Sequence, residues 1–139
     1  MDRGPQFDSI DDMFPNGRDD ALTPWPTAVG SKTTGKLGYS AAAVNMDTVR
    51  DAPLEDVDVS GGNVRATQSR ILRQHVAYYG GPQYQETGET SADQGKEGNR
   101  FPVIYRKKSG EDIIVSGHHR SAAALLAKKP VKAKVIREI

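Results

Sequence analysis

The chain has 139 residues, a hydrophobic fraction of 36% and a net charge of +1, so we expect a single domain with a modest core. No stretch approaches the roughly 18 consecutive apolar residues that a membrane span needs, and the acidic N-terminus lacks the pattern of a secretory signal. The absence of cysteine excludes disulfides, thiolate chemistry and cysteine metal sites. We therefore expect a cytoplasmic protein that makes no membrane contact.

The small net charge hides two halves of opposite sign. Residues 1–62 hold 5 Lys or Arg against 11 Asp or Glu, whereas residues 63–139 hold 14 against 7. A basic half is suited to polyphosphate or nucleic acid, and an acidic segment could shield it in the same chain. Two solvated faces of opposite sign explain the pattern as well.

Residues 1–53 show little hydrophobic periodicity. Trp25 lies between two prolines, residues 30–38 are rich in Gly, Ser, Thr and Lys, and residues 40–49 fit a short helix. Flanking prolines disfavour both helix and sheet, and the small polar residues are typical of linkers. We predict an acidic, flexible and largely irregular N-terminal arm, which offers a contact for a protein partner.

From residue 54 onward the sequence predicts a domain over 54–139. Residues 54–59 fit a strand that a double glycine ends, and Thr67 is a plausible N-cap for a helix that extends to Tyr79. A polar loop follows at about 80–100. Such a long loop in a compact domain is either mobile or functional.

The last 39 residues carry the strongest pattern. Residues 101–105 and 111–115 are β-rich runs joined by a short polar turn, which predicts a hairpin. Residues 121–129 predict an alanine-rich helix that ends before Pro130, and residues 131–136 alternate as a strand does. The expected fold is a small α/β (α+β) domain with a mixed sheet and packed helices.

A glycine and four polar residues join the second of these strands to the alanine-rich helix: Gly117, His118, His119, Arg120 and Ser121. A helix N-terminus has unpaired N–H donors and a positive dipole end, which favour phosphate. Arg120 adds a bidentate guanidinium, and the histidines add hydrogen bonds or proton transfer. The alternative is a polar turn that only caps the helix.

This segment, with a strand before it and residues 130–136 after it, resembles the ParB/sulfiredoxin fold. It is most similar to the N-terminal, ParB-like nuclease domain, and the resemblance covers roughly residues 54–139. It implies that Gly117, His119, Arg120 and Ser121 bind the phosphates of a nucleotide such as CTP or ATP, with Mg²⁺ as a cofactor. His118 stands where ParB proteins usually have a glutamate and sulfiredoxins a reactive cysteine, so sulfiredoxin activity is excluded.

The resemblance suggests a nuclease or NTPase. His118 or His119 would act as general base or acid, and Arg120 would stabilise phosphoryl charge. The carboxylates of Glu55, Asp56, Asp58, Glu111 and Asp112 are the candidates for holding Mg²⁺. Glu111 and Asp112 open the strand that leads to the motif, so we expect them at its far end. Zinc held by His118, His119 and His75 is disfavoured, and we predict no metal ligand set.

The alternative function is a DNA-binding or host-protein-binding module of a phage or mobile element that uses the fold as a scaffold. Phosphate contacts would come from basic residues in the hairpin turn and at the helix end: Arg106, Lys107, Lys108, Lys128 and Lys129. Lys132 and Lys134 fit either such a contact or a protected edge strand. A homodimer is left open.

Overall fold

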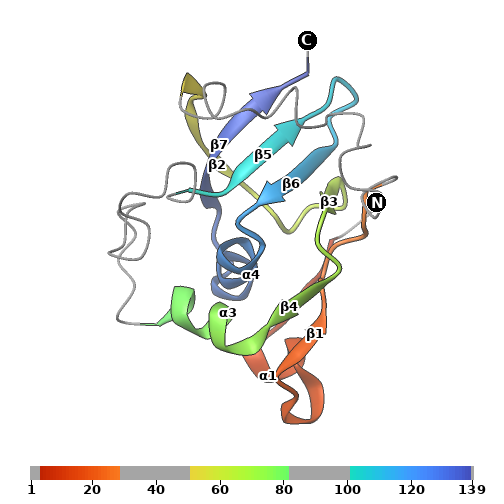
Figure 1. The fold of residues 1–139 in the computed structure, drawn as a ribbon, viewed down its shortest axis with the longest axis vertical. Helices are drawn as coiled ribbons and strands as arrows, with labels where there is room; N and C mark the ends of the chain where they lie inside the picture. Colours follow the sequence, from red (N-terminus) through yellow and green to blue (C-terminus); the bar gives the residue numbers. More distant parts are fainter. Residues whose placement is uncertain (1–3, 29–50, 82–100, 139) are drawn as a thin grey trace.

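The computed structural model describes residues 4–28, 51–81 and 101–138, which form a mixed α/β fold (Figure 1). A five-stranded sheet lies above two helices, and a two-stranded sheet lies beside them. The small α/β class predicted from the sequence is confirmed. The helix predicted at residues 40–49 and nearly all of the polar loop at about 80–100 lie outside the described residues.

The larger sheet has the strand order β2–β7–β5–β6–β3. Its strands are β2 (Leu54–Val57), β3 (Val64–Ala66), β5 (Val103–Arg106), β6 (Asp112–Ser116) and β7 (Val131–Arg137). Pairing is antiparallel for β2–β7 and β5–β6, and parallel for β5–β7 and β3–β6. The predicted hairpin is therefore present as β5 and β6, each shifted by one or two residues along the chain.

Strand β7 occupies the interior of this sheet, between β2 and β5. Val131, Ala133 and Val135 are buried on one face, as the alternation predicted. The interpretation of Lys132 and Lys134 as guards of an edge strand is wrong, because β7 has a partner on both sides. Lys134 instead donates from Nζ to the carbonyl oxygen of Ala52, at 3.1 Å.

The second sheet corrects the helix predicted from Thr67. Strand β1 (Asp20–Leu22) pairs antiparallel with β4 (Arg70–Leu72), and helix α3 (Arg73–Gly80) begins only after β4. Ile71 lies opposite Ala21 and is fully buried. The stretch before residue 73 is thus extended because the N-terminal segment supplies it with a partner strand, and a partner 50 residues away leaves no local periodicity to detect.

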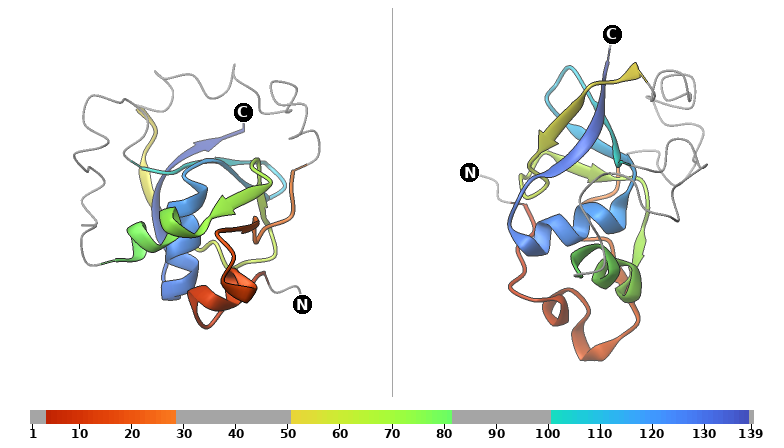
Figure 2. Two further views of the ribbon diagram at one scale, coloured as in Figure 1. Left: turned by 60° about the horizontal axis from the view of Figure 1, so that its bottom comes forward. Right: turned by 90° about the vertical axis from the view of Figure 1, so that its left-hand side faces the viewer.

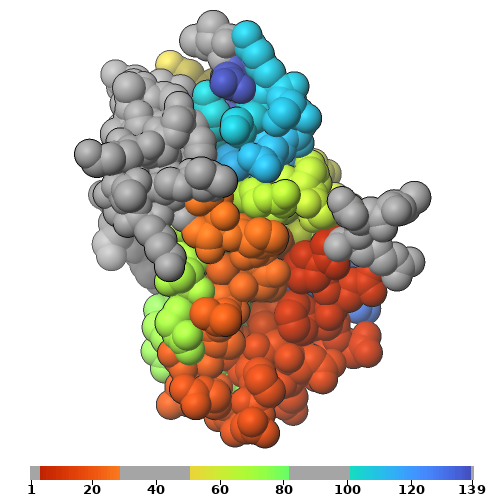
Figure 3. All heavy atoms as spheres, turned by 90° about the vertical axis from the view of Figure 1, so that its right-hand side faces the viewer, coloured from red at the N-terminus to blue at the C-terminus, as the bar shows by residue number. Residues whose placement is uncertain are grey.

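Residues 4–28 share the core of the domain. Helix α1 (Ile10–Met13) and the single-turn helix η1 (Pro15–Gly17) lead into β1, and Phe14 and Trp25 are 0% and 2% exposed. Figure 3 shows this segment, in red and orange, lying against residues coloured green. Residues 4–28, predicted as part of an irregular N-terminal arm, contribute buried side chains to the same apolar cluster as the residues that follow position 54.

The two faces of the larger sheet carry separate apolar clusters. Helix α4 (His118–Ala127) packs on one face with α3 and the N-terminal segment, as the two views of Figure 2 show. The other face holds Val103, Tyr105, Ile113 and Ile136. Within the described ranges no helix has the length and apolar character needed to cross a membrane.

Candidate functional site

Helix α4 begins at His118, immediately after the left-handed residue Gly117 (φ 84°). A Cβ at Gly117 would lie 2.6 Å from Cα of Pro102, so both the backbone angle and the space favour glycine. The predicted start of this helix at Ser121 was three residues late. Consequently His118, His119 and Arg120 form its first turn, and successive side chains point in different directions, about 100° apart around the axis.

His118 points into the core. It is 3% exposed, its ring centre lies 6.4 Å from that of Trp25, and its Nε2 accepts a hydrogen bond from the N–H of Thr67, at 3.1 Å. Burial, with a smaller effect of His119, lowers the pKa of His118 to about 4. A neutral ring whose Nε2 accepts carries its proton on Nδ1. In this arrangement neither nitrogen is available to take a proton from a substrate.

His119 points toward the junction of β4 and α3. Its Nε2 accepts a hydrogen bond from the N–H of Leu72, at 3.0 Å, and its ring centre lies 4.9 Å from that of His75 on α3. Burial lowers the pKa of His119, and the charge of His75 lowers it further. His119 is therefore neutral at pH 7 and joins α4 to the chain segment that leads into α3.

Arg120 points in a third direction, toward Phe101 and the C-terminal end of α3. Its residue is 7% exposed, and its guanidinium carbon lies 5.2 Å from the centre of the Phe101 ring, a favourable cation–π distance. Ser121, the last predicted phosphate ligand, is 0% exposed and its N–H donates to the carbonyl oxygen of Gly117, at 2.9 Å. The five motif residues thus do not converge on one point.

A cavity of about 160 Å³ lies between α3, α4 and the start of β7. Its polar wall comprises Arg120 and Lys129, and the Gly80–Gly81 backbone forms the opposite side. The remaining lining residues are Tyr79, Ala123, Ala124, Ala127 and Val131. Among the described residues that line this cavity, the charged side chains are those of Arg120 and Lys129, and both types of side chain bind anions readily.

The basic residues predicted as nucleic-acid contacts fall into two groups. Lys128 and Lys129 precede the first residue of β7, whereas Arg106 pairs in register with Arg137 at its last residue. A seven-residue strand spans roughly 20 Å, so the two groups do not form one continuous patch. Lys128 donates from Nζ to the carbonyl oxygen of Phe7, at 2.9 Å, which holds the N-terminal segment on α4.

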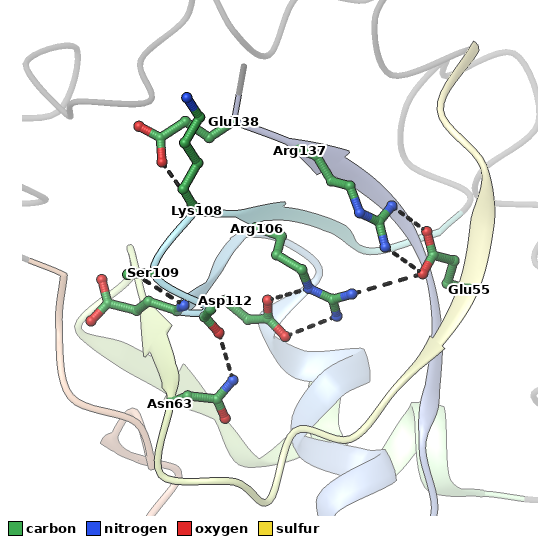
Figure 4. A network of polar contacts seen from close by, with 10 residues as sticks. Glu55, Asn63, Arg106, Lys108, Ser109, Asp112, Arg137 and Glu138 are labelled. Carbon is green, nitrogen blue, oxygen red and sulfur yellow. Dashed lines mark hydrogen bonds and ion pairs between the residues drawn. The ribbon is translucent and has the colours of Figure 1, made fainter.

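The hairpin group is part of a network of ion pairs at the far end of the sheet (Figure 4). Arg106 donates to both carboxylate oxygens of Asp112, at 2.7 and 3.1 Å, and Arg137 donates to both oxygens of Glu55, at 2.6 and 2.9 Å. The Arg137 guanidinium holds the pKa of the Glu55 carboxyl below its usual value. Lys107 lies 3.8 Å from Glu111, and the Lys108 backbone N–H donates to Glu138.

Four of the five carboxylates considered for a metal, those of Glu55, Asp58, Glu111 and Asp112, lie in this network or beside other partners. Asp112 opens β6 and Gly117 follows its end, which confirms that this carboxylate is at the far end of the strand from the motif. Asp58 accepts from the hydroxyl of Ser60, at 2.6 Å. Across residues 4–28, 51–81 and 101–138, no three His, Asp or Glu side chains gather as a metal ligand set.

Sequence reasoning missed the partners that give each motif residue its direction. The N–H groups of Thr67 and Leu72 receive the two imidazoles, and Phe101 lies beside Arg120. These partners are between 19 and 51 positions away along the chain, so no local pattern reveals them. The one available signal was the aromatic residue at position 101, the first residue of a predicted strand.

Comparisons of the chain with family models, with curated proteins and with solved structures found no match. The resemblance to ParB-like domains therefore depends on the motif itself and on the order of the elements around it.

Proposed function

We propose that this chain is a ParB-like domain that binds the phosphate groups of a nucleotide or nucleic acid, with Arg120 and Lys129 as the phosphate ligands. The observation that carries the proposal is the cavity between α3 and α4, in which a nearly buried guanidinium and a lysine share a wall. Buried cations are usually found opposite an anion or a π-system. Phe101 supplies a π-system beside Arg120, and the guanidinium and the ammonium have the charge and the donors that bind phosphate.

The size and lining of the cavity set what it accepts. About 160 Å³ admits one or two phosphoryl groups, whereas drug-sized ligands occupy sites of roughly 300–1,000 Å³. The base and sugar of a nucleotide would consequently remain outside. Gly80 and Gly81 present backbone without side chains on the opposite wall, which leaves room for the phosphate oxygens to approach.

We expect the site to bind phosphate without proton transfer by its histidines. His118 is buried and neutral, and Nε2 of both His118 and His119 already accepts a backbone hydrogen bond. Hydrolysis through these imidazoles would first require the rings to leave their partners. Nuclease or NTPase activity, and the role of Mg²⁺, stay predictions of the resemblance.

Isothermal titration with pyrophosphate, CTP, ATP and GTP tests the proposal. We expect saturable binding that falls roughly 10- to 100-fold in Arg120→Ala, because a charge-assisted hydrogen bond contributes about 1.5–3 kcal/mol. The exposed residue Lys129 provides a second variant, Lys129→Ala, that leaves the core intact. Lys132→Ala, on β7 outside the cavity, is the matched loss of one positive charge.

Equal binding in wild type, Lys129→Ala and Lys132→Ala would overturn the assignment of the cavity. Failure of all four ligands to bind the wild-type protein would overturn phosphate binding itself.

A further inference from the structure

His119 makes a contact between α4 and the beginning of α3. Its Nε2 accepts from the N–H of Leu72, which is the residue that precedes α3 and pairs with Asp20 in the small sheet. The ring also lies against that of His75, in the first turn of α3, with an angle of 36° between the two planes. Two separate interactions of one imidazole thus hold α3 on α4.

This contact depends on a neutral ring. A protonated imidazole has two N–H donors and no acceptor, so the Leu72 N–H would lose its partner and two donors would face each other. The charged ring would also lie beside His75. Burial and His75 already lower the pKa of His119, as expected where the packing favours the neutral form.

The charged and titratable neighbours of His119 do not replace the lost acceptor. His75 lies on α3 and His118 precedes His119 on α4. The Arg73 guanidinium turns away, to Asp11 and to the face of Phe14. Arg70 on β4 donates to Asp20, at 2.8 Å. No carboxylate among these described neighbours is positioned to stabilise a charged His119.

The same helix forms a wall of the cavity. His119 fixes the first turn of α3 through Leu72 and His75, and the last residues of α3, Tyr79 and Gly80, line the cavity opposite Arg120. Movement of α3 relative to α4 therefore changes the width of the cavity.

We propose that His119 is a pH-sensitive latch: its protonation releases the Leu72 N–H, loosens α3 from α4 and weakens the binding of phosphate in the cavity. The release of Leu72 is independent of any ligand. The effect on binding is the part that rests on the proposed function.

Nuclear magnetic resonance tests the latch directly in the full chain. Between pH 8 and 5 we expect the Leu72 amide resonance and the His119 ring resonances to shift with one common midpoint, below the ordinary value of about 6.5 for histidine. His75→Gln removes the neighbouring charge and should raise that midpoint. His119→Gln keeps an acceptor oxygen that does not titrate, so the Leu72 shift should vanish. A Leu72 amide that does not respond to pH, or that responds equally in His119→Gln, would overturn the latch.

Isothermal titration with CTP at pH 7.5 and 5.5 tests the second step. We expect the affinity of the wild-type protein to fall at pH 5.5, and the ratio of the two affinities to be smaller in His119→Gln. Protonation of CTP itself affects both proteins alike, so an equal ratio would overturn control of the cavity by His119. Absence of CTP binding at both values of pH would contradict the proposed function, whereas the Leu72 titration would still stand.

Discussion

Two charged regions of this protein lie at opposite ends of strands β6 and β7, and they differ in how their charges are matched. At one end Arg106 and Arg137 face Asp112 and Glu55 through paired hydrogen bonds. At the other end Arg120 and Lys129 are the charged residues in the described lining of a cavity. In the first region each of these arginines is matched by a carboxylate. The second is the region in which we propose that phosphate binds, and counting basic residues along the sequence does not separate the two.

The two histidines of the motif are held in a different way from the ion-pair network. Both accept backbone hydrogen bonds as neutral rings, whereas the residues of the ion-pair network are held by charge. The two regions should therefore respond to acid in different ranges of pH. The stability that depends on neutral His118 should be lost between pH 6.5 and about 4, whereas the stability that depends on ionised Glu55, whose pKa is lowered from 4.5, should be lost only below pH 4.5.

The largest effect we expect is acid destabilisation through His118. The pKa of this buried ring is lowered from 6.5 to about 4, so the unfolded chain binds a proton that the folded protein does not. Stability is fully present above pH 6.5 and is lost as the pH falls toward 4, by an amount on the order of 3 kcal/mol. Urea unfolding at pH 7 and at pH 4.5 measures this loss.

The control for that experiment is His118→Gln, which keeps an acceptor for the Thr67 N–H but does not titrate. Its free energy of unfolding should depend less steeply on pH across this window. Identical pH profiles for the two proteins would contradict the assignment to His118.

The next effect concerns the ion-pair network. Asp112→Ala removes the buried partner of Arg106, whose side chain is 30% exposed, and leaves the guanidinium with Glu55, at 3.8 Å, as its remaining ion-pair partner. We expect a loss of about 2 kcal/mol in the free energy of unfolding, below the 3–5 kcal/mol of a fully buried pair because water reaches Arg106. Affinity for CTP should not change. Weaker CTP binding in a folded Asp112→Ala protein would contradict the claim that the ion-pair network takes no part in phosphate binding.

The smallest effect belongs to Lys128, next in sequence to Lys129 but held on the N-terminal segment. Lys128→Ala removes the bond to the Phe7 carbonyl and an exposed pair with Asp8, at 3.6 Å. We expect a loss of less than about 1 kcal/mol in unfolding free energy and an affinity for pyrophosphate equal to that of wild type. A drop in affinity as large as that of Lys129→Ala would show that general positive charge, and not the cavity, attracts the ligand.

The elements that the sequence predicted well are those with local signals. The alternation of residues 131–136, the hairpin at 101–116 and the alanine-rich helix before Pro130 all depend on neighbours a few positions apart. The strand β4 was missed because its partner β1 is about 50 residues away, and pairing over that distance leaves no period in the sequence.

The site was predicted as a set of residues but not as a geometry. Gly117 opens the helix as expected, yet His118, His119 and Arg120 diverge because residues at adjacent helical positions point in different directions. His118 lies in the core beside Trp25, His119 lies against His75 on α3, and Arg120 lies beside Phe101 at the cavity. Only the folded chain brings these residues to the motif.

Nuclear magnetic resonance can locate a phosphate bound in the cavity between α3 and α4. A titration of the protein with pyrophosphate should shift the backbone amides of Gly80, Gly81 and Lys129, together with the Arg120 guanidinium, while those of Arg106 to Lys108 stay in place. Shifts confined to Arg106–Lys108, or no shift at saturating pyrophosphate, would contradict the account.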